Sequence, residues 1–221
     1  MYYFLIPVPI SIALTVYYFI IKNREDLKKN AIIQPLTTLV AIIVAALSFL
    51  HPNVNPAYTT WILVGLGLSF LADIFNIDMK NDRILLAAIG VFVLAYSEYG
   101  VTFTVFSSFQ SQDWLLGIFF LAVYVILMIY YWPGLGSFRL PVLVYGLVMP
   151  FMVWRAASTF FGGFFSLPQS ILVTAGTAAL YIGDIEYGIH RFRKPLKRIY
   201  GPLLYEGGQL LIALSCSLFL H

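Results

Sequence analysis

The stretch YTTWILVGLGLSFLADIFNIDMKNDR, residues 58–83, contains an apolar run that carries an aspartate before it ends. Residues 58–77 are enough for an α-helix to cross a hydrocarbon core of ~30 Å. An ionised carboxylate in the middle of such a helix costs about 2.5–3.5 kcal/mol or more, so it is seldom found there without a partner or a role. The stretch therefore predicts a membrane-spanning helix in which Asp73 has a function.

The composition extends this prediction to the whole chain. Of its 221 residues, 61% are hydrophobic and only 10% are charged. Soluble domains contain about 45–50% apolar and about 25% charged residues, so a soluble fold is excluded. We expect an all-α integral membrane protein surrounded by membrane lipids. The net charge of +3 comes from basic residues in the loops between the apolar segments, so it does not indicate a nucleic-acid partner.

Eight apolar segments, each close to the ~20 residues that a spanning helix needs, follow one another with short loops between them. The sequence predicts a bundle of eight transmembrane helices in a single domain, residues 1–221. The segments are about 3–21, 31–50, 58–77, 84–105, 114–132, 139–161, 168–188 and 200–220.

The basic residues are distributed unevenly between the two sets of loops. Twelve of the 13 Lys and Arg residues lie in the loops after segments one, three, five and seven. Basic loops face the cytoplasm, so both termini are predicted on the outer face, as in a protein of a bacterial cytoplasmic membrane. The remaining basic residue, Arg155, lies in the outer half of its segment. We expect it to pair with Glu98, which is at a similar depth.

Two polar stripes run along the third and seventh segments, and each includes an aspartate. Both segments run from the outside to the inside, so Asp73 and Asp184 are predicted at similar depth, in the inner third. Residues spaced i, i+4, i+7 share one face of a helix, and a polar face in a membrane helix points to the bundle interior or to a wet cavity. The stripes consist of Ser69, Asp73 and Asn76, and of Thr177, Tyr181 and Asp184.

Further polar side chains on the fourth and eighth segments are candidates to surround these aspartates. At ~100° per residue, Glu98 points about 200° away from Tyr96, so one pocket does not easily hold both. The alternative for the tyrosines and the glutamine is helix packing, and for the acids it is interfacial solvation or ion pairing. The predicted substrate-binding residues are Tyr96, Glu98, Tyr99, Tyr181, Tyr205, Glu206 and Gln209.

The chain also shows signs of an internal repeat. Asp73 and Asp184 are 111 residues apart, and each follows a glycine by eight residues, in GLGLSFLADI and GTAALYIGDI. Proline lies near the start of both the second and the sixth segment. We expect two four-helix halves of the same orientation, about 1–110 and 111–221, related by an axis along the membrane normal. This would bring both aspartates to one interface.

Other kinds of active site have no support in the sequence. The three histidines, His51, His190 and His221, are scattered and lack the spacing of a metal site, and no glycine-rich phosphate loop or GxSxG motif occurs. No metal and no cofactor are predicted. Two close carboxyls repel each other's charge, so one keeps a proton beside an ionised partner. Such a pair suits substrates that one proton activates and water then attacks: acetals, glycosides and vinyl ethers, and less readily peptides.

Several short motifs resemble those of the YhhN family, whose animal members are lysoplasmalogenases. They are QPLTT (34–38), GLGLSFLADI (65–74), IGVFVLAYSEY (89–99), YIGDI (181–185) and YEGGQLLI (205–212). The resemblance implies an intramembrane hydrolase that cleaves the vinyl ether bond of lysoplasmalogens into a fatty aldehyde and a glycerophospho-headgroup. It also implies that Asp73 and Asp184 are the catalytic residues, one as the acid while the other orients water.

Two positions depart from the family pattern. Gln34 stands where the family commonly has lysine, and Tyr96 stands where it commonly has histidine. Because a cation and an imidazole are lost, headgroup recognition and the identity of the substrate stay open. A lysophospholipid-like substrate would reach the site from the bilayer. The headgroup, the chain length, the division of roles between the aspartates and the oligomeric state stay open.

Two other classes of protein are compatible with the same residues. A small transporter or lipid carrier could use the carboxyls as a proton relay at the repeat interface. An intramembrane aspartyl protease is a weaker alternative, because Tyr181 stands where the first glycine of a Gly-x-Gly-Asp motif is required.

Overall fold

The computed structural model describes residues 2–21, 27–78, 81–193 and 200–217. These residues form α-helices and short 3₁₀ turns and no strand, which confirms the predicted all-α class. The α-helices are α1 (Val8–Ile21), α2 (Leu27–Leu47), α3 (Pro56–Phe75), α4 (Asp82–Ser107), α5 (Asp113–Tyr131), α6 (Arg139–Ser158), α7 (Leu167–Phe192) and α8 (Gly201–Leu214).

Six of the eight helices, α1 to α6, are long and apolar enough to cross a membrane, with a 3₁₀ turn extending some of them. The chain is therefore compatible with an integral, multi-pass membrane protein. α7 and α8 do not meet the same measure: α8 has only 14 residues, and α7 includes several charged residues. That these two also span the membrane stays a prediction.

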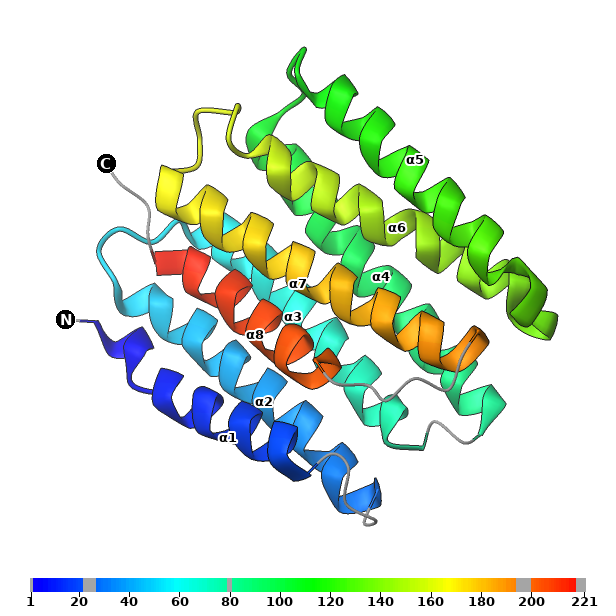
Figure 1. Cartoon of the computed structure of the whole chain (residues 1–221). Coiled ribbons are helices and arrows are strands. Elements are labelled where there is room, and N and C mark those ends of the chain that lie inside the picture. The colour runs from blue at the N-terminus through cyan, green and yellow to red at the C-terminus, as the bar shows by residue number, and fades with distance from the viewer. Residues whose placement is uncertain (1, 22–26, 79–80, 194–199, 218–221) are drawn as a thin grey trace.

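The helices lie side by side, and six of them form a ring (Figure 1). Around the ring α2 packs on α3, α3 on α4, α4 on α6, α6 on α7, α7 on α8, and α8 on α2. α1 packs outside the ring against α2 and α8, and α5 packs outside against α6. The faces that turn into the ring position the polar side chains described below.

The starts of α3 and α7 show why these helices begin where they do. The Asn55 side chain accepts a hydrogen bond from the backbone of Tyr58, and the Ser166 side chain accepts one from the backbone of Gln169. Each cap is followed by a proline in the first turn, where a missing N–H has no cost. The two caps are 111 residues apart, the same separation as the two aspartates. This correspondence supports the proposal of two related halves.

α7 and α8 approach each other closely at two glycines. A Cβ atom built on Gly176 would lie 2.8 Å from the carbonyl oxygen of Gly208, and one built on Gly208 would lie 2.6 Å from that of Gly176. Small residues let membrane helices pack backbone to backbone. The contact fixes the position of α8 against α7, and thereby the place of the polar side chains on α8.

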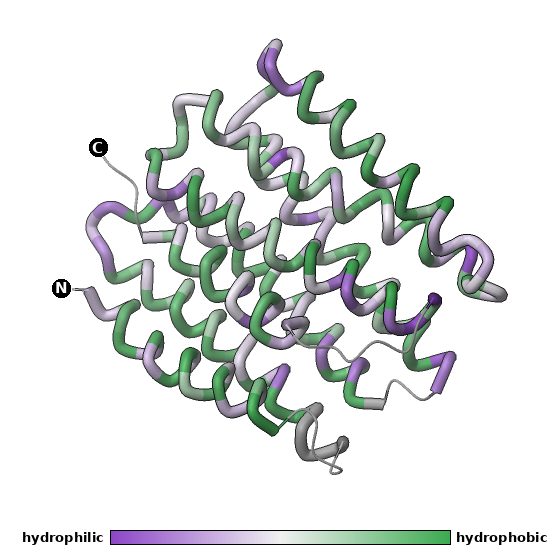
Figure 2. The backbone as a smooth tube through the Cα atoms, viewed as in Figure 1, coloured by the Kyte–Doolittle hydropathy of each residue, from purple (hydrophilic) through white to green (hydrophobic). Residues whose placement is uncertain are grey.

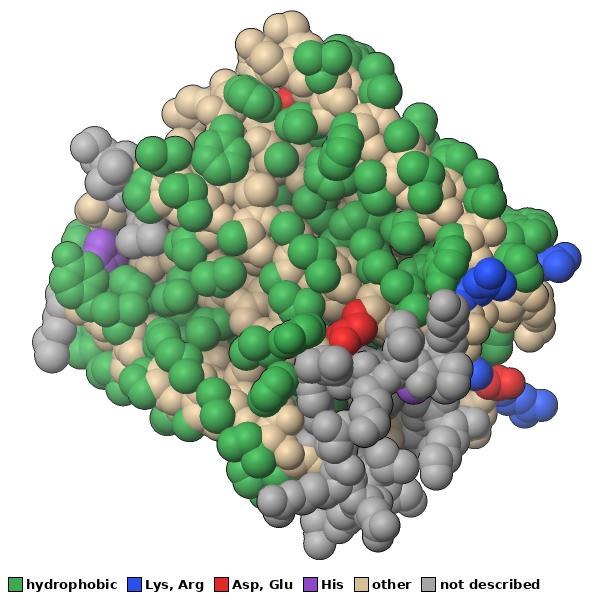
Figure 3. Space-filling model, viewed as in Figure 1, with side chains coloured by type: hydrophobic (Ala, Val, Ile, Leu, Met, Phe, Trp, Pro, Cys, Tyr) green, Lys and Arg blue, Asp and Glu red, His purple; other side chains and the backbone are tan. Residues whose placement is uncertain are grey.

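The surface separates into an apolar belt and a charged end. α5 is apolar almost throughout (Figure 2), and side chains such as Leu115 and Ile129 are exposed. In the view of Figure 3, the Lys and Arg side chains that are visible gather at one end of the molecule. The described basic residues at the start of α4 and α6 and the end of α7 are Arg83, Arg139, Arg191 and Arg193. The predicted basic residues Lys22, Arg24, Lys80, Lys194, Lys197 and Arg198, and the side chains of Lys28 and Lys29, lie outside the described residues.

Candidate functional site

A cavity of about 110 Å³ lies within the bundle towards the charged end. Its wall is formed where α1, α5 and α7 end and where α2, α4, α6 and α8 begin. Aromatic and aliphatic side chains make up most of it, and the polar groups are few. The polar side chains of the wall are Tyr18, Gln34, Asn76, Tyr131, Tyr145, Tyr181, Asp184, Tyr187, Tyr205 and Glu206.

Asp73 lies directly behind this wall and is 1% exposed. Three side chains donate hydrogen bonds to its carboxylate: Gln34 Nε2 at 2.7 Å and the Tyr205 hydroxyl at 2.8 Å to Oδ1, and the Thr38 hydroxyl at 2.6 Å to Oδ2. They come from α2, which neighbours α3 in the ring, and from α8, which neighbours α2. Three donors match the acceptor capacity of an ionised carboxylate and orient it.

A chain of hydrogen bonds fixes the direction in which Tyr205 donates. The Tyr99 hydroxyl donates to Gln209 Oε1 at 3.0 Å, which turns the amide nitrogen of Gln209 towards Tyr205. Gln209 Nε2 donates to the Tyr205 oxygen at 3.3 Å, so the hydrogen of Tyr205 is left to point at Asp73. Tyr99 and Gln209 are themselves fully buried and are not part of the cavity wall. They act on Asp73 through Tyr205.

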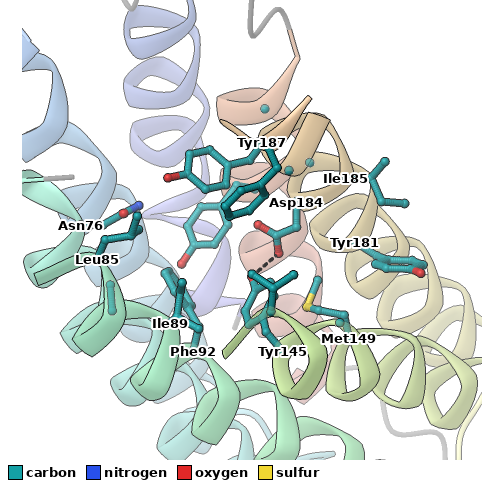
Figure 4. A pocket seen from close by; sticks show the side chains of 18 of the residues that line it. Asn76, Leu85, Ile89, Phe92, Tyr145, Met149, Tyr181, Asp184, Ile185 and Tyr187 are labelled. Carbon is teal, nitrogen blue, oxygen red and sulfur yellow. Dashed lines mark hydrogen bonds between the residues drawn. The ribbon is translucent and has the colours of Figure 1, made fainter. Parts of the chain in front are cut away.

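Asp184 belongs to the cavity wall itself and is partly exposed to it. The Tyr145 hydroxyl on α6 donates to its Oδ2 at 2.7 Å (Figure 4). The pair Tyr145–Asp184 is separated by 39 residues, the same separation as Gln34–Asp73. Each aspartate thus accepts a hydrogen bond from a residue of the preceding helix, α2 for Asp73 and α6 for Asp184. This arrangement supports the proposed internal repeat.

Of the other predicted residues, some line the cavity and some lie behind its wall. Tyr181 and Glu206 line the cavity, although in Figure 4 the Tyr181 ring points away from Asp184. Tyr96 is fully buried, and its ring stacks on Phe92 and contacts the ring of Tyr145, with centroids 5.5 and 5.9 Å apart. It supports the wall from behind. The structure therefore brings both aspartates, Tyr181, Tyr205 and Glu206 to one cavity or its immediate backing.

Glu98 points to another part of the molecule, and its expected ion pair with Arg155 is wrong. Thr102 donates to Glu98 Oε1 at 2.7 Å, and the side chain leans over Gly65 on α3. Arg155 instead bonds Asp113 at 2.8 Å, with both side chains fully buried. Glu98 points towards α3, whereas Arg155 points towards α5. Asp113, the first residue of α5, packs directly over the end of α6.

The sequence did not predict three contacts of the site: those of Gln34 and Thr38 with Asp73, and that of Tyr145 with Asp184. Gln34 and Thr38 both lie in the QPLTT motif. A signal for Tyr145 was present: the offset of 111 residues that relates the aspartates also places Tyr145 opposite Gln34. The prolines near the starts of the second and sixth segments, Pro35 and Pro141, are 106 residues apart, so an alignment of the halves on them hides this correspondence.

Comparison with known proteins adds one finding to this geometry. The model of the YhhN family matches residues 29–216, which is most of the chain. The chain belongs to the YhhN family. No curated protein and no solved structure matches the chain. Membership of the YhhN family is consistent with a hydrolase-like membrane protein, and the site provides carboxyls, which are suited to acid/base chemistry.

Proposed function

We propose that this YhhN-family chain is an intramembrane hydrolase of the vinyl ether bond of lysoplasmalogens. It would release a fatty aldehyde and a glycerophospho-headgroup. The observation that carries the proposal is the cavity with Asp184 in its wall and Asp73 fixed behind it by three donors. Vinyl ethers need a proton, a stabilised cation and a water molecule, and carboxyls can supply or orient all three.

The two aspartates differ in their surroundings, which supports different roles for them. Asp73 accepts three hydrogen bonds and is sealed from the cavity, so its charge is fixed near the site without direct contact. A fixed negative charge in a medium of low dielectric constant stabilises an oxocarbenium ion that forms nearby. Asp184 lies in the wall, where it can accept a proton from the attacking water. The resulting hemiacetal then collapses to aldehyde and alcohol.

The position of the cavity suits a single-chain lipid that arrives from the side. The cavity lies towards the end of the bundle that carries Arg139, Arg191 and Arg193, where a phosphate would sit. The apolar side chains of α4, α5 and α6 that line the rest of the wall would contact the first carbons of the chain. Both termini would then lie on the outer face and the basic loops in the cytoplasm.

The first experiment measures aldehyde release from lysoplasmenyl-ethanolamine by the protein purified in detergent. We expect release by the unaltered protein and loss of release in Asp73→Asn and in Asp184→Asn. Glu98→Gln serves as the matched control, because it neutralises a carboxyl of the same bundle that lies outside the wall. Full activity in both aspartate variants would contradict the mechanism, and no aldehyde from folded protein would contradict the function.

The runner-up is a small transporter or lipid carrier that uses the same carboxyls as a proton relay. The correspondence of the helix caps and of the aspartate donors between the halves is the observation that favours it, since such repeats are common in transporters. A hydrolase turns over in detergent, whereas a transporter needs two compartments. Substrate accumulation in sealed proteoliposomes under a proton gradient, without aldehyde in detergent, would favour transport.

A further inference from the structure

Glu206 is a third carboxyl at the cavity, and its surroundings differ from those of both aspartates. It lies in the first turns of α8, next to Tyr205, and forms part of the cavity wall. Its side chain is 2% exposed. Neither of its oxygens has a hydrogen-bond partner among the residues that the structure describes. A buried carboxyl at the wall of a site, with no internal partner, indicates a role for the substrate complex rather than for folding.

The hydrogen-bond pattern assigns the protons among the three groups. Gln34, Thr38 and Tyr205 all donate to Asp73, and Tyr145 donates to Asp184, so both aspartates are acceptors. The nearby Thr37 hydroxyl donates to the backbone carbonyls of Ile33 and Gln34 and leaves both Glu206 oxygens without a donor among the described residues. An ionised carboxylate buried without a donor or a cation is very costly, whereas the neutral acid costs far less. Of the three carboxyls, Glu206 is the one whose surroundings favour the protonated form.

We propose that Glu206 is the proton donor that starts the reaction. This inference rests on the proposed function and adds a third acid to its two aspartates. The Glu206 proton passes to the outer carbon of the vinyl ether, whose π electrons form the new C–H bond and leave an oxocarbenium ion. Water adds to the adjacent carbon, and its proton passes to Asp184. As the hemiacetal breaks its C–O bond to the glycerol oxygen, that oxygen takes the proton from Asp184. The hemiacetal hydroxyl loses its own proton to Glu206 as the aldehyde C=O forms, so both carboxyls return to their starting forms.

The position of Glu206 in the chain suits this role. Its neighbour on α8, Tyr205, donates to Asp73 on α3, so the proton donor lies close to the fixed negative charge. The Glu206 oxygens are covered, and the hydrogen bonds of catalytic groups are commonly completed only in the substrate complex. Rotation of the flexible glutamate side chain carries the acid to the cavity.

The test compares Glu206→Gln with Glu206→Asp and with Glu98→Gln. For Glu206→Gln we expect kcat for lysoplasmenyl-ethanolamine to fall by about 100-fold or more, with KM changed only slightly, because a general acid is lost and the shape is kept. Glu206→Asp retains an acid and should recover part of kcat. Glu98→Gln should match the unaltered protein. The solvent isotope effect expected for proton transfer to carbon should be present only in proteins that keep an acid at position 206.

A second measurement does not depend on turnover. The infrared carbonyl band of a protonated carboxylic acid, identified by its shift in D₂O, should be lost in Glu206→Gln and kept in Glu98→Gln. An unchanged band in Glu206→Gln, or unchanged kcat, would overturn the inference while the hydrolase stands. Loss of the band together with no aldehyde from the unaltered protein would overturn the reaction, and with it the donor role, but not the neutral state of Glu206.

Discussion

Two polar clusters are buried in this bundle, and they differ in charge balance and in hydrogen bonding. The arginine cluster (Arg155, Asp113, Thr104, Ser107, Ser108 and Ser158) joins α4, α5 and α6 at one end of the ring. The cavity cluster (Asp73, Asp184 and Glu206) lies towards the other end. The first balances its charge and satisfies its donors. The second holds three acidic groups around a space, with no Lys or Arg in the described part of the wall.

The guanidinium of Arg155 shows what a structural polar group requires. Its three nitrogens find five acceptors at 2.5–3.1 Å, which equals its number of N–H donors. The ring of Phe109 packs on it with the centroid 4.1 Å away. Within the cluster, Asp113 Oδ1 is a buried atom with no partner among the described residues. Glu206 differs, because neither of its oxygens has one. Arg155 is therefore expected to serve stability, and Glu206, which lines the cavity, to serve function.

The largest effect is expected in the cavity cluster. Asp184→Asn should lower kcat by about 100- to 10,000-fold, because an acid/base group is lost, and leave the thermal unfolding midpoint nearly unchanged. Asp73→Asn should lose activity as well, and it should also unfold at lower temperature, because an amide cannot accept all three donors. Aldehyde release and unfolding in detergent separate the two. Equal midpoints for both variants would contradict the difference drawn between the aspartates.

In the arginine cluster, the largest effect should be on folding. Arg155→Met should lower the free energy of unfolding by about 3–5 kcal/mol, because Asp113 is left as a buried charge without its partner. Activity per folded molecule should not change. Adding Asp113→Asn should restore part of the stability. Chemical unfolding in mixed micelles measures this, and a double variant less stable than Arg155→Met would show that the ion pair is not the cause.

A smaller effect is expected for the donor to Asp184. Tyr145→Phe removes a hydrogen bond to a charged group and should lower kcat by about tenfold or more. Tyr124→Phe is the matched control. The Tyr124 hydroxyl on α5 lies outside the wall and donates to the carbonyl of Leu143 on α6, the helix that carries Tyr145. Equal rates for the two variants would show that the Tyr145 hydroxyl does not position Asp184.

The smallest effect is expected for the acid that belongs to neither cluster. Glu98→Gln keeps the hydrogen bond from Thr102 and should change the free energy of unfolding by less than about 1 kcal/mol, with activity retained. A large loss of activity in a stably folded Glu98→Gln protein would place this carboxyl in the mechanism after all and would remove the basis for the comparison.

The family assignment and the all-helical fold were predictable from the sequence, and so was the pairing of the two aspartates as a hypothesis. GLGLSFLADI and YIGDI carry the resemblance, and the polar stripes placed Asp73 and Asp184 at one depth. The expected Glu98–Arg155 pair was wrong because it was inferred from the similar depth of the two residues, without the rotation of their helices about the helix axes. Two charges at the same level of a bundle can point in different directions, and only the packing of the helices decides which side chains meet.

The sequence by itself determined the apolar helical segments and predicted their alternating basic loops and the depth of each acid, because hydropathy and helical spacing are local properties of the chain. The tertiary structure alone decided the partners: Tyr145 for Asp184, Thr38 and Tyr205 for Asp73, and none of the described groups for Glu206. Such contacts depend on the rotation of each helix about its axis and on close approaches such as Gly176 against Gly208. These are set by packing between segments far apart in the chain.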